Sequence, residues 1–153
     1  MANIRKEKCL DKRITTILGD AIQELKKLDA ESVDLVITDP PYNLGKDYGN
    51  NHDSMSKEAY INFTREWLTE VDRVLKKDGS IYVFMGVQFI SYLFLILSDE
   101  LSYQLNAWIT WHYTQGIGKR KGFSPRHDDI LFFNKTEKFN FYLDNIRVPQ
   151  KYY

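Results

Sequence analysis

The stretch Val33–Tyr42 reads VDLVITDPPY and joins a strand pattern to an abrupt stop. Val33–Thr38 is an almost continuous apolar run, which is typical of a strand covered on both faces. Asp39-Pro40-Pro41-Tyr42 follows directly, and its two prolines lack the N–H groups that a β-ladder requires. The stretch therefore predicts a buried strand that ends in a rigid turn.

A strand and a helix are expected upstream of this stretch. Ile14–Leu18 is a short, β-branched run that predicts a strand. Asp20 is suited to cap the helix that follows, with Gln23 three residues later as in a capping box. The apolar face of this helix is expected to consist of Ala21, Ile22, Leu25 and Leu28.

A loop, a long helix and a second strand are expected downstream. Residues 43–54 are rich in Gly, Asn and Asp, which predicts a loop. Ser56 suits the start of the helix, and Gly79 suits a left-handed cap at its end. Ser80–Met85 then predicts another buried strand. One stripe of the helix is apolar at three- and four-residue steps: Tyr60, Phe63, Trp67, Val71 and Val74.

The remaining elements complete an alternating pattern. Val87–Leu97 is apolar nearly all round and predicts a deeply packed helix, while Tyr103–Tyr113 and Ile130–Asn134 predict two more strands. Alternating strands and helices favour an α/β fold with a parallel sheet. Right-handed crossovers would bring the loops after Thr38 and Met85 to the same carboxyl edge, where open α/β sheets bind ligands.

The composition fits a single globular domain over residues 1–153. The 21 Lys and Arg residues balance the 21 Asp and Glu residues, so the net charge gives no argument for nucleic-acid binding. Only local clusters of basic residues could indicate such binding. The single Cys9 excludes an internal disulfide framework, and without a secretory signal the chain is expected in the cytoplasm. The longest apolar run, residues 89–97, is too short to span a membrane.

Two interpretations of the turn Asp39–Tyr42 are open. A proline turn in which the Asp bonds its own backbone needs no function. However, Thr38–Leu44, TDPPYNL, resembles the catalytic signature D/N/S-P-P-Y/F/W of the DNA amino-methyltransferases, which methylate exocyclic amines of adenine or cytosine. Further segments resemble that family in the order of its β-type arrangement: Gly19–Ala21, Val33–Leu35, Asp78–Phe84, Trp108–Trp111 and Asp129–Lys135.

The resemblance implies a fold and a role for each residue of the signature. The fold would be a partial, Rossmann-like sheet of S-adenosylmethionine-dependent methyltransferases, with helices on both faces and an antiparallel C-terminal strand pair. Asp39 and the Pro40 carbonyl would each accept one N–H of the target amine, and Tyr42 would stack on a flipped base. Asp39 and Pro41 would form part of the S-adenosylmethionine site. Transfer would be direct, so positioning would do most of the work.

The resemblance leaves the methylated base open. An acidic first residue is commoner among adenine-N6 enzymes, so an adenine-N6 methyltransferase of a restriction-modification type is the leading hypothesis. A cytosine-N4 enzyme is the alternative in the same class. A non-catalytic DNA-binding subunit, or a remnant without function, is the alternative of another class.

The family's Gly-rich cofactor loop has no counterpart among the eight glycines of the chain. In the β-type arrangement that loop and the target-recognition region follow the catalytic part, so residues 1–153 are expected to be the catalytic half. The strand Val33–Thr38 would then lack a neighbour, and unpaired strand edges recruit partners. We therefore expect a second polypeptide that completes the sheet, or a truncated product that is inactive alone.

The basic stretch Gly116–Arg126 also leaves two interpretations open. It has neither the Gly-Lys-Ser/Thr of a Walker loop nor the helix start of a dinucleotide fingerprint. It is either a solvated loop or a loop that contacts DNA phosphates. In the second case the donors are Lys119, Arg120, Lys121 and Arg126. No metal site is expected, because the three histidines lack metal-ligand spacing.

Overall fold

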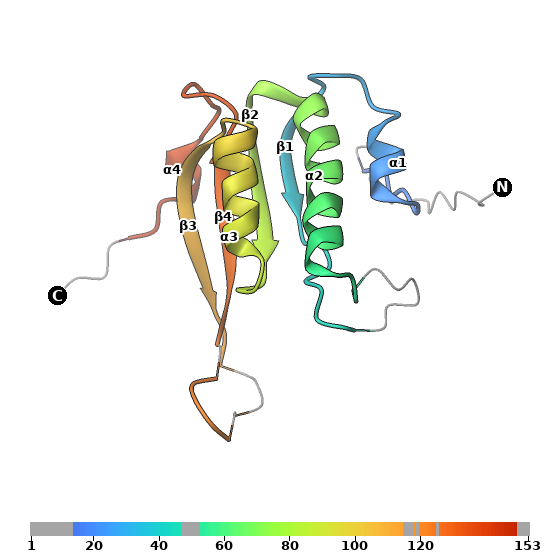
Figure 1. Cartoon of the computed structure of the whole chain (residues 1–153). Helices are drawn as coiled ribbons and strands as arrows, with labels where there is room; N and C mark the ends of the chain where they lie inside the picture. Colours follow the sequence, from blue (N-terminus) through green and yellow to red (C-terminus); the bar gives the residue numbers. More distant parts are fainter. Residues whose placement is uncertain (1–13, 47–52, 115–117, 119, 125, 150–153) are drawn as a thin grey trace.

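A four-stranded sheet organises the chain, in the order β1-β2-β4-β3 (Figure 1). The structure is a computed structural model that describes residues 14–46, 53–114, 118, 120–124 and 126–149. β1 (Val33–Thr38) lies parallel to β2 (Leu75–Met85). β4 (His127–Asn134) runs antiparallel to β2 and to β3 (Gln104–His112). The α/β class, with parallel strands and an antiparallel C-terminal pair, is thus confirmed.

The longer helices cover one face of this sheet. α2 (Lys57–Val74), α3 (Ile90–Leu95) and the π-helix η1 (Ile96–Glu100) lie in front of it in Figure 1. α1 (Ala21–Leu25) packs beside α2, past the free edge of β1. The short helix α4 (Leu143–Ile146) follows a segment on the opposite face, where the ring of Phe141 lies 6.1 Å from that of Phe132. Within the described parts of the chain, no helix combines the length and apolarity needed to cross a bilayer.

The core lies between the sheet and the helices α2, α3 and η1. The central strands β2 and β4 contribute fully buried side chains, among them Ile81, Val83, Leu131 and Phe133. The predicted stripe of α2 is confirmed at its buried members Tyr60, Trp67, Val71 and Val74, while Phe63 is half-buried and Thr64 and Leu68 are buried in addition.

Both predicted helix caps, Asp20 and Ser56, are confirmed. Asp20 Oδ1 accepts a hydrogen bond from the N–H of Gln23 at 3.0 Å. Ser56 Oγ accepts one from the N–H of Ala59 at 3.2 Å. Each side-chain oxygen satisfies a donor that the helix itself leaves without a partner. These caps fix the first turns of α1 and α2, and both helices contribute residues to the site described below.

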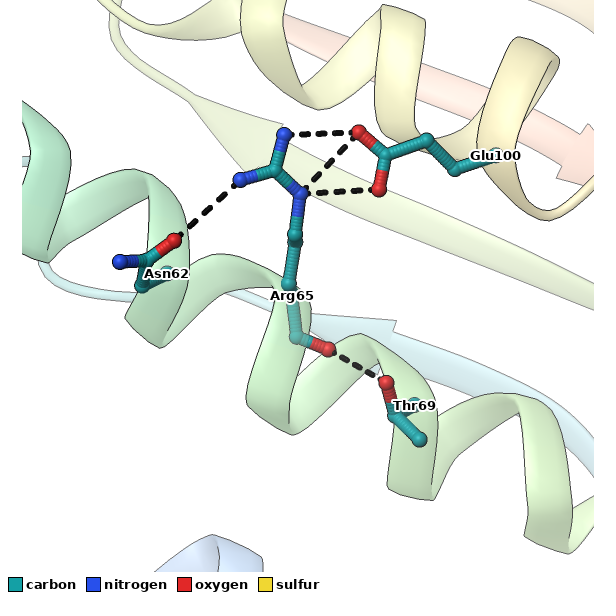
Figure 2. Close-up of polar contacts among 4 residues, drawn as sticks. All are labelled: Asn62, Arg65, Thr69 and Glu100. Carbon is teal, nitrogen blue, oxygen red and sulfur yellow. Dashed lines mark hydrogen bonds and ion pairs between the residues drawn. The ribbon is translucent and has the colours of Figure 1, made fainter.

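An ion pair on the surface joins α2 to the end of η1 (Figure 2). The Arg65 guanidinium contacts the Glu100 carboxylate at 2.8 Å through Nε and at 2.8 Å through Nη2. Its Nη1 also donates to Asn62 Oδ1 at 3.3 Å, and the Thr69 hydroxyl donates to the Arg65 carbonyl at 2.8 Å. Both charged side chains are exposed, so the pair orients two helices and adds little to stability.

Two predictions for the part of the chain before Ser80 are wrong. Ile14–Leu18 is exposed and forms no strand, because no strand of the described structure lies beside it to pair with its backbone. The helix that starts at Lys57 ends at Val74, since Leu75 is extended, fully buried and paired with Val33. Gly79 accordingly lies in β2 and lacks the positive φ expected of a helix cap.

The burial expected for two elements also differs from the structure. β1 is not covered on both faces, because Leu35 and Ile37 are exposed and, among the described strands, β2 alone pairs with it. The third helix begins at Ile90 instead of Val87, and Leu95 on it is exposed. The exposure of β1 agrees with the expectation that this strand lacks a neighbour.

Candidate active site

The turn Asp39–Tyr42 leaves the carboxyl end of β1 next to the end of β2. Thr38 pairs with Val83 in the parallel ladder, so the segments that follow β1 and β2 emerge at the same edge of the sheet. The predicted shared edge is confirmed. There the Tyr42 ring lies against the backbone of Gly86, where an added Cβ would stand 3.3 Å from Tyr42 Cδ2.

Two cavities adjoin at this turn. The larger, of about 630 Å³, lies between α1, β1 and α2, and its apolar lining includes Ile22, Leu25, Val36, Phe63, Trp67 and Val71. The smaller, of about 380 Å³, is lined in part by Tyr42, Leu44, Lys46 and Asp128. Asp39, Pro40 and Pro41 line both cavities. A chemical group bound at these three residues can therefore contact a ligand in either cavity.

The Asp39 carboxylate is open to a donor. Asp39 is exposed, and no ion pair engages it within the described part of the chain. Burial raises the pKa of the Tyr42 hydroxyl above its ordinary value, and a hydrogen bond with the Asp39 carboxylate raises it further. Tyr42 thus stays protonated. Because a carboxylate offers about four acceptor positions, Asp39 retains capacity for the N–H of an amine.

Two side chains close the base of the loop that follows the turn. Asn43 has a left-handed backbone, with φ 58°, which Asn tolerates better than most residues. Its amide accepts from the Met55 N–H at 2.7 Å and donates to the Met55 carbonyl at 2.9 Å. Asp53, 1% exposed, accepts from the N–H groups of Leu44 and Lys46 at 3.2 and 2.6 Å. The ends of the predicted loop are therefore fixed, while residues 47–52 lie outside the described structure.

The helix α2 reaches the turn through Tyr60. The Tyr60 hydroxyl donates a hydrogen bond to the carbonyl of Pro41 and lies 3.4 Å from Sδ of Met85 at the end of β2. Tyr60 is 1% exposed, and this burial raises the pKa of its hydroxyl, which stays protonated as a donor. From the sequence Tyr60 could line the pocket, but its place in the apolar stripe favoured a structural role.

The strand β4 brings a second carboxylate to the smaller cavity. Asp128 lines it together with Asp39, whereas the next residue, Asp129, accepts the indole N–H of Trp108 at 2.9 Å. No motif indicated Asp128. Only its place in the topology could have indicated it. Asp128 lies at the start of β4, and because β4 runs antiparallel to β2, this start lies at the carboxyl end of β2. Among the described residues, no three His, Cys, Asp or Glu side chains gather as a metal site requires.

Of the basic residues expected to contact DNA, the three that the structure describes do not line either cavity. Arg126 Nη1 donates to the carbonyl of Thr114 at 2.9 Å, and Arg120 and Lys121 are exposed. Lys119 lies outside the described residues. β3 ends and β4 begins at the edge of the sheet where β1 and β2 end (Figure 1). Arg120, Lys121 and Arg126 therefore stand on the side of the molecule that carries the turn.

Relatives of known sequence contain the same segment. Residues 33–153 match the sequence profile of a DNA methylase family, the N6-N4 methyltransferases. The chain is 57% identical over 145 residues to the Type II methyltransferase M.HpaI of Haemophilus parainfluenzae, a match that covers 94% of this chain and 46% of that protein. It is 35% identical over 139 residues to the DNA adenine methyltransferase YhdJ of Escherichia coli K12, covering 90% and 47%.

Solved structures share the fold. The cytosine-N4-specific PvuII DNA methyltransferase superposes with a TM-score of 0.66 at 22% identity, over 80% of this chain and 49% of that one. A DNA modification methylase of Thermus thermophilus in complex with S-adenosyl-L-methionine gives 0.59 at 22% identity, over 88% and 55%. The chain belongs to the DNA methylase family of N6 and N4 methyltransferases. It spans about half the length of the curated relatives that it matches.

Proposed function

We propose that this chain is the catalytic half of a DNA methyltransferase that transfers a methyl group from S-adenosylmethionine to the N6 amine of adenine. The observation that carries the proposal is the position of Asp39 and Pro40 at the carboxyl end of β1, where two cavities adjoin. One cavity can receive the base and the other the methyl donor. The acceptor pair then lies between them.

The acceptor pair accounts for activation of the amine. The lone pair of an aromatic amine is delocalised into its ring, so the nitrogen is a weak nucleophile. The Asp39 carboxylate and the Pro40 carbonyl can each accept one N–H, which pins the nitrogen and favours a pyramidal lone pair aimed at the methyl group. Tyr42, with its ring against Gly86, offers a surface for a base flipped out of the duplex.

The residues present fit one part of a cofactor site. The larger cavity combines apolar walls with the carboxylate of Asp39, which suits a cationic sulfonium attached to an adenosine. Asp39 and Pro41 would contact the cofactor there. When bound, S-adenosylmethionine supplies an electrophilic methyl carbon, and the electron pair of the broken C–S bond remains on sulfur. The amine lone pair forms the new N–C bond, and the surplus N–H proton is held by Asp39 before it passes to water.

Among the described strands only β2 pairs with β1, and this observation supports a two-part enzyme together with the half-length match. We propose that residues 1–153 form one catalytic domain, and that the cofactor loop and the target-recognition region come from a second polypeptide or from the rest of a longer chain. DNA is the substrate, with Lys119, Arg120, Lys121 and Arg126 as phosphate contacts. A cytoplasmic location is part of the same proposal.

Adenine is favoured over cytosine by the acidic Asp39 and by the adenine specificity named for the Escherichia coli relative. The structural likeness to a cytosine-N4 enzyme, at 22% identity, concerns the fold alone. Cytosine N4 is therefore the second candidate. If the chain were a non-catalytic DNA-binding subunit, Asp39, Pro40 and Pro41, which line both cavities, would have no chemical role.

The test uses a completed enzyme, in which this chain replaces its counterpart in the Haemophilus parainfluenzae relative. DNA is incubated with S-adenosylmethionine labelled in the methyl group and then hydrolysed to nucleosides. We expect label in the N6-methylated adenine nucleoside, and we expect the Asp39→Ala variant to incorporate it about 100-fold more slowly or slower still. Label in the N4-methylated cytosine nucleoside would replace the adenine assignment. Labelling by Asp39→Ala at the rate of the unmodified completed enzyme, or no labelling by the unmodified completed enzyme, would refute the proposed function.

A further inference from the structure

Tyr60 connects the longest helix of the chain to the signature turn. We propose that Tyr60 is a positioning residue for methyl transfer, whose hydroxyl holds the Pro41 carbonyl and thereby leaves the Pro40 carbonyl directed at the target amine. This inference rests on the proposed function. It assigns to a core position of α2 a role that its place in an apolar stripe does not indicate.

The two prolines explain why one hydrogen bond can hold the turn. Proline has no N–H, and its ring fixes φ near −65°, so ψ is the remaining soft torsion at Pro40 and at Pro41. The Tyr60 hydroxyl engages the Pro41 carbonyl and thus restrains the second of these torsions. Two neighbouring carbonyls then have separate partners: Pro41 bonds the protein, and Pro40 is left for the substrate.

Tyr60 is itself held firmly. Its side chain is 1% exposed, its ring lies 4.3 Å from that of Phe89, and its oxygen lies 3.4 Å from Met85 Sδ. A hydroxyl on so constrained a ring has a fixed position relative to the end of β2. The Tyr60 side chain therefore fixes the position of the turn after β1 relative to the neighbouring strand β2.

A second connection fixes the start of α2 relative to the same turn. The Asn43 side chain bonds both backbone groups of Met55, and Ser56, the next residue, caps α2. Tyr60 follows one helical turn later, where its N–H donates to the Ser56 carbonyl at 2.9 Å. The turn is thus hydrogen-bonded to the start of α2 at two points: Asn43 bonds Met55, and Tyr60 bonds the Pro41 carbonyl. Two such connections suit a turn whose atoms must be placed within a fraction of an ångström.

The hydroxyl is suited to be a permanent donor. Burial is the largest cause of the raised pKa of Tyr60, and the nearby carboxylate of Asp53 adds to it. Ionisation of Tyr60 is therefore suppressed over the working range of an enzyme. The hydrogen bond to Pro41 does not depend on pH in that range.

The test compares Tyr60→Phe with Tyr103→Phe in the completed enzyme. Tyr103 is 4% exposed and donates to Asp72 Oδ1 at 2.9 Å, so its variant also deletes one hydroxyl from a buried tyrosine. Its partner Asp72 lies three turns of α2 beyond Tyr60, roughly 18 Å along the helix axis. Tyr60→Phe should slow single-turnover methyl transfer about tenfold or more while leaving the Kd for DNA within about twofold. Tyr103→Phe should leave both values within about twofold of the unmodified enzyme.

A second measurement on the chain itself reads the turn without catalysis. Hydrogen exchange of the peptide over residues 39–46 reports the N–H groups of Leu44, Gly45 and Lys46, which all bond to Asp53. Exchange there should accelerate in Tyr60→Phe and stay unchanged in Tyr103→Phe. The inference is overturned if Tyr60→Phe transfers methyl groups at the unmodified rate, or if exchange over residues 39–46 is unaltered. Loss of activity in Asp39→Ala alongside normal activity in Tyr60→Phe would sink this inference alone and leave the proposed function standing.

Discussion

The side-chain amide of Asn43 pairs with both backbone groups of Met55, accepting from its N–H at 2.7 Å and donating to its carbonyl at 2.9 Å. One residue thereby joins the end of the signature turn to the start of α2. The same residue carries a positive φ, so its side chain and its backbone are both required at this point.

Replacing Asn43 should therefore destabilise the chain. Asn43→Ala loses both hydrogen bonds and places alanine in the left-handed region, and we expect a loss of about 2–3 kcal/mol in the free energy of unfolding, measured in urea. Asn140→Ala is the control, because it removes one exposed hydrogen bond to Asp78 and should cost less than about 0.5 kcal/mol. Equal stability of the two variants would contradict the role assigned to Asn43.

Core packing around β4 makes a second prediction. Leu131 is 0% exposed on a strand between β2 and β3, so Leu131→Ala should lower the free energy of unfolding by about 2–5 kcal/mol. Leu105→Ala on the edge strand β3 is the control, because Leu105 is 42% exposed. A loss for Leu105→Ala as large as that for Leu131→Ala would mean that the strand order is wrong.

The ion pair of Arg65 and Glu100 makes stability depend on pH. The hydrogen bonds from Arg65 hold the pKa of Glu100 below its ordinary value in the folded chain. A lowered folded-state pKa gives stability that is present above the unfolded pKa, about 4.3, and is lost as the pH falls through the folded value. Glu100→Gln should be slightly less stable than the unmodified chain at pH 7, and the difference should vanish in acid. A difference that grows on acidification would contradict this assignment.

The contact between Gly86 and Tyr42 predicts an effect on catalysis. A Cβ at Gly86 would stand 3.3 Å from Tyr42 Cδ2, so Gly86→Ala should shift the ring that we propose stacks on the base. We expect methyl transfer by the completed enzyme to fall about tenfold or more, on the scale of other small misplacements. Gly118→Ala is the control, because no atom of the other described residues lies within 4 Å of its added Cβ. If both variants retain full activity, Tyr42 does not depend on Gly86.

Local chemistry made much of this fold predictable. The bounds of β1 follow from an apolar run that two prolines stop, and the starts of α1 and α2 follow from Asp20 and Ser56. The errors lie where pairing across the chain overrides local preference. Leu75 leaves the helix because it pairs with Val33, and Ile14–Leu18 stays irregular because no strand of the described structure lies beside it.

The candidate site was predictable only in part for the same reason. Asp39, Pro40, Pro41 and Tyr42 form one motif and were identified together. Asp128 and Tyr60 reach the motif from β4 and α2, and tertiary packing alone brings them there. Neither residue has a neighbour in sequence that would indicate its contact.

The most direct measurement of the central claim is the single-turnover rate of methyl transfer for Asp39→Ala beside Asp34→Ala in the completed enzyme. Both variants remove an exposed carboxylate associated with β1, but Asp34 pairs with Lys76 away from the turn. We predict that Asp39→Ala lowers the rate by about 100-fold or more with DNA affinity retained, and that Asp34→Ala leaves the rate within about twofold. Equal rates for the two variants would contradict the account.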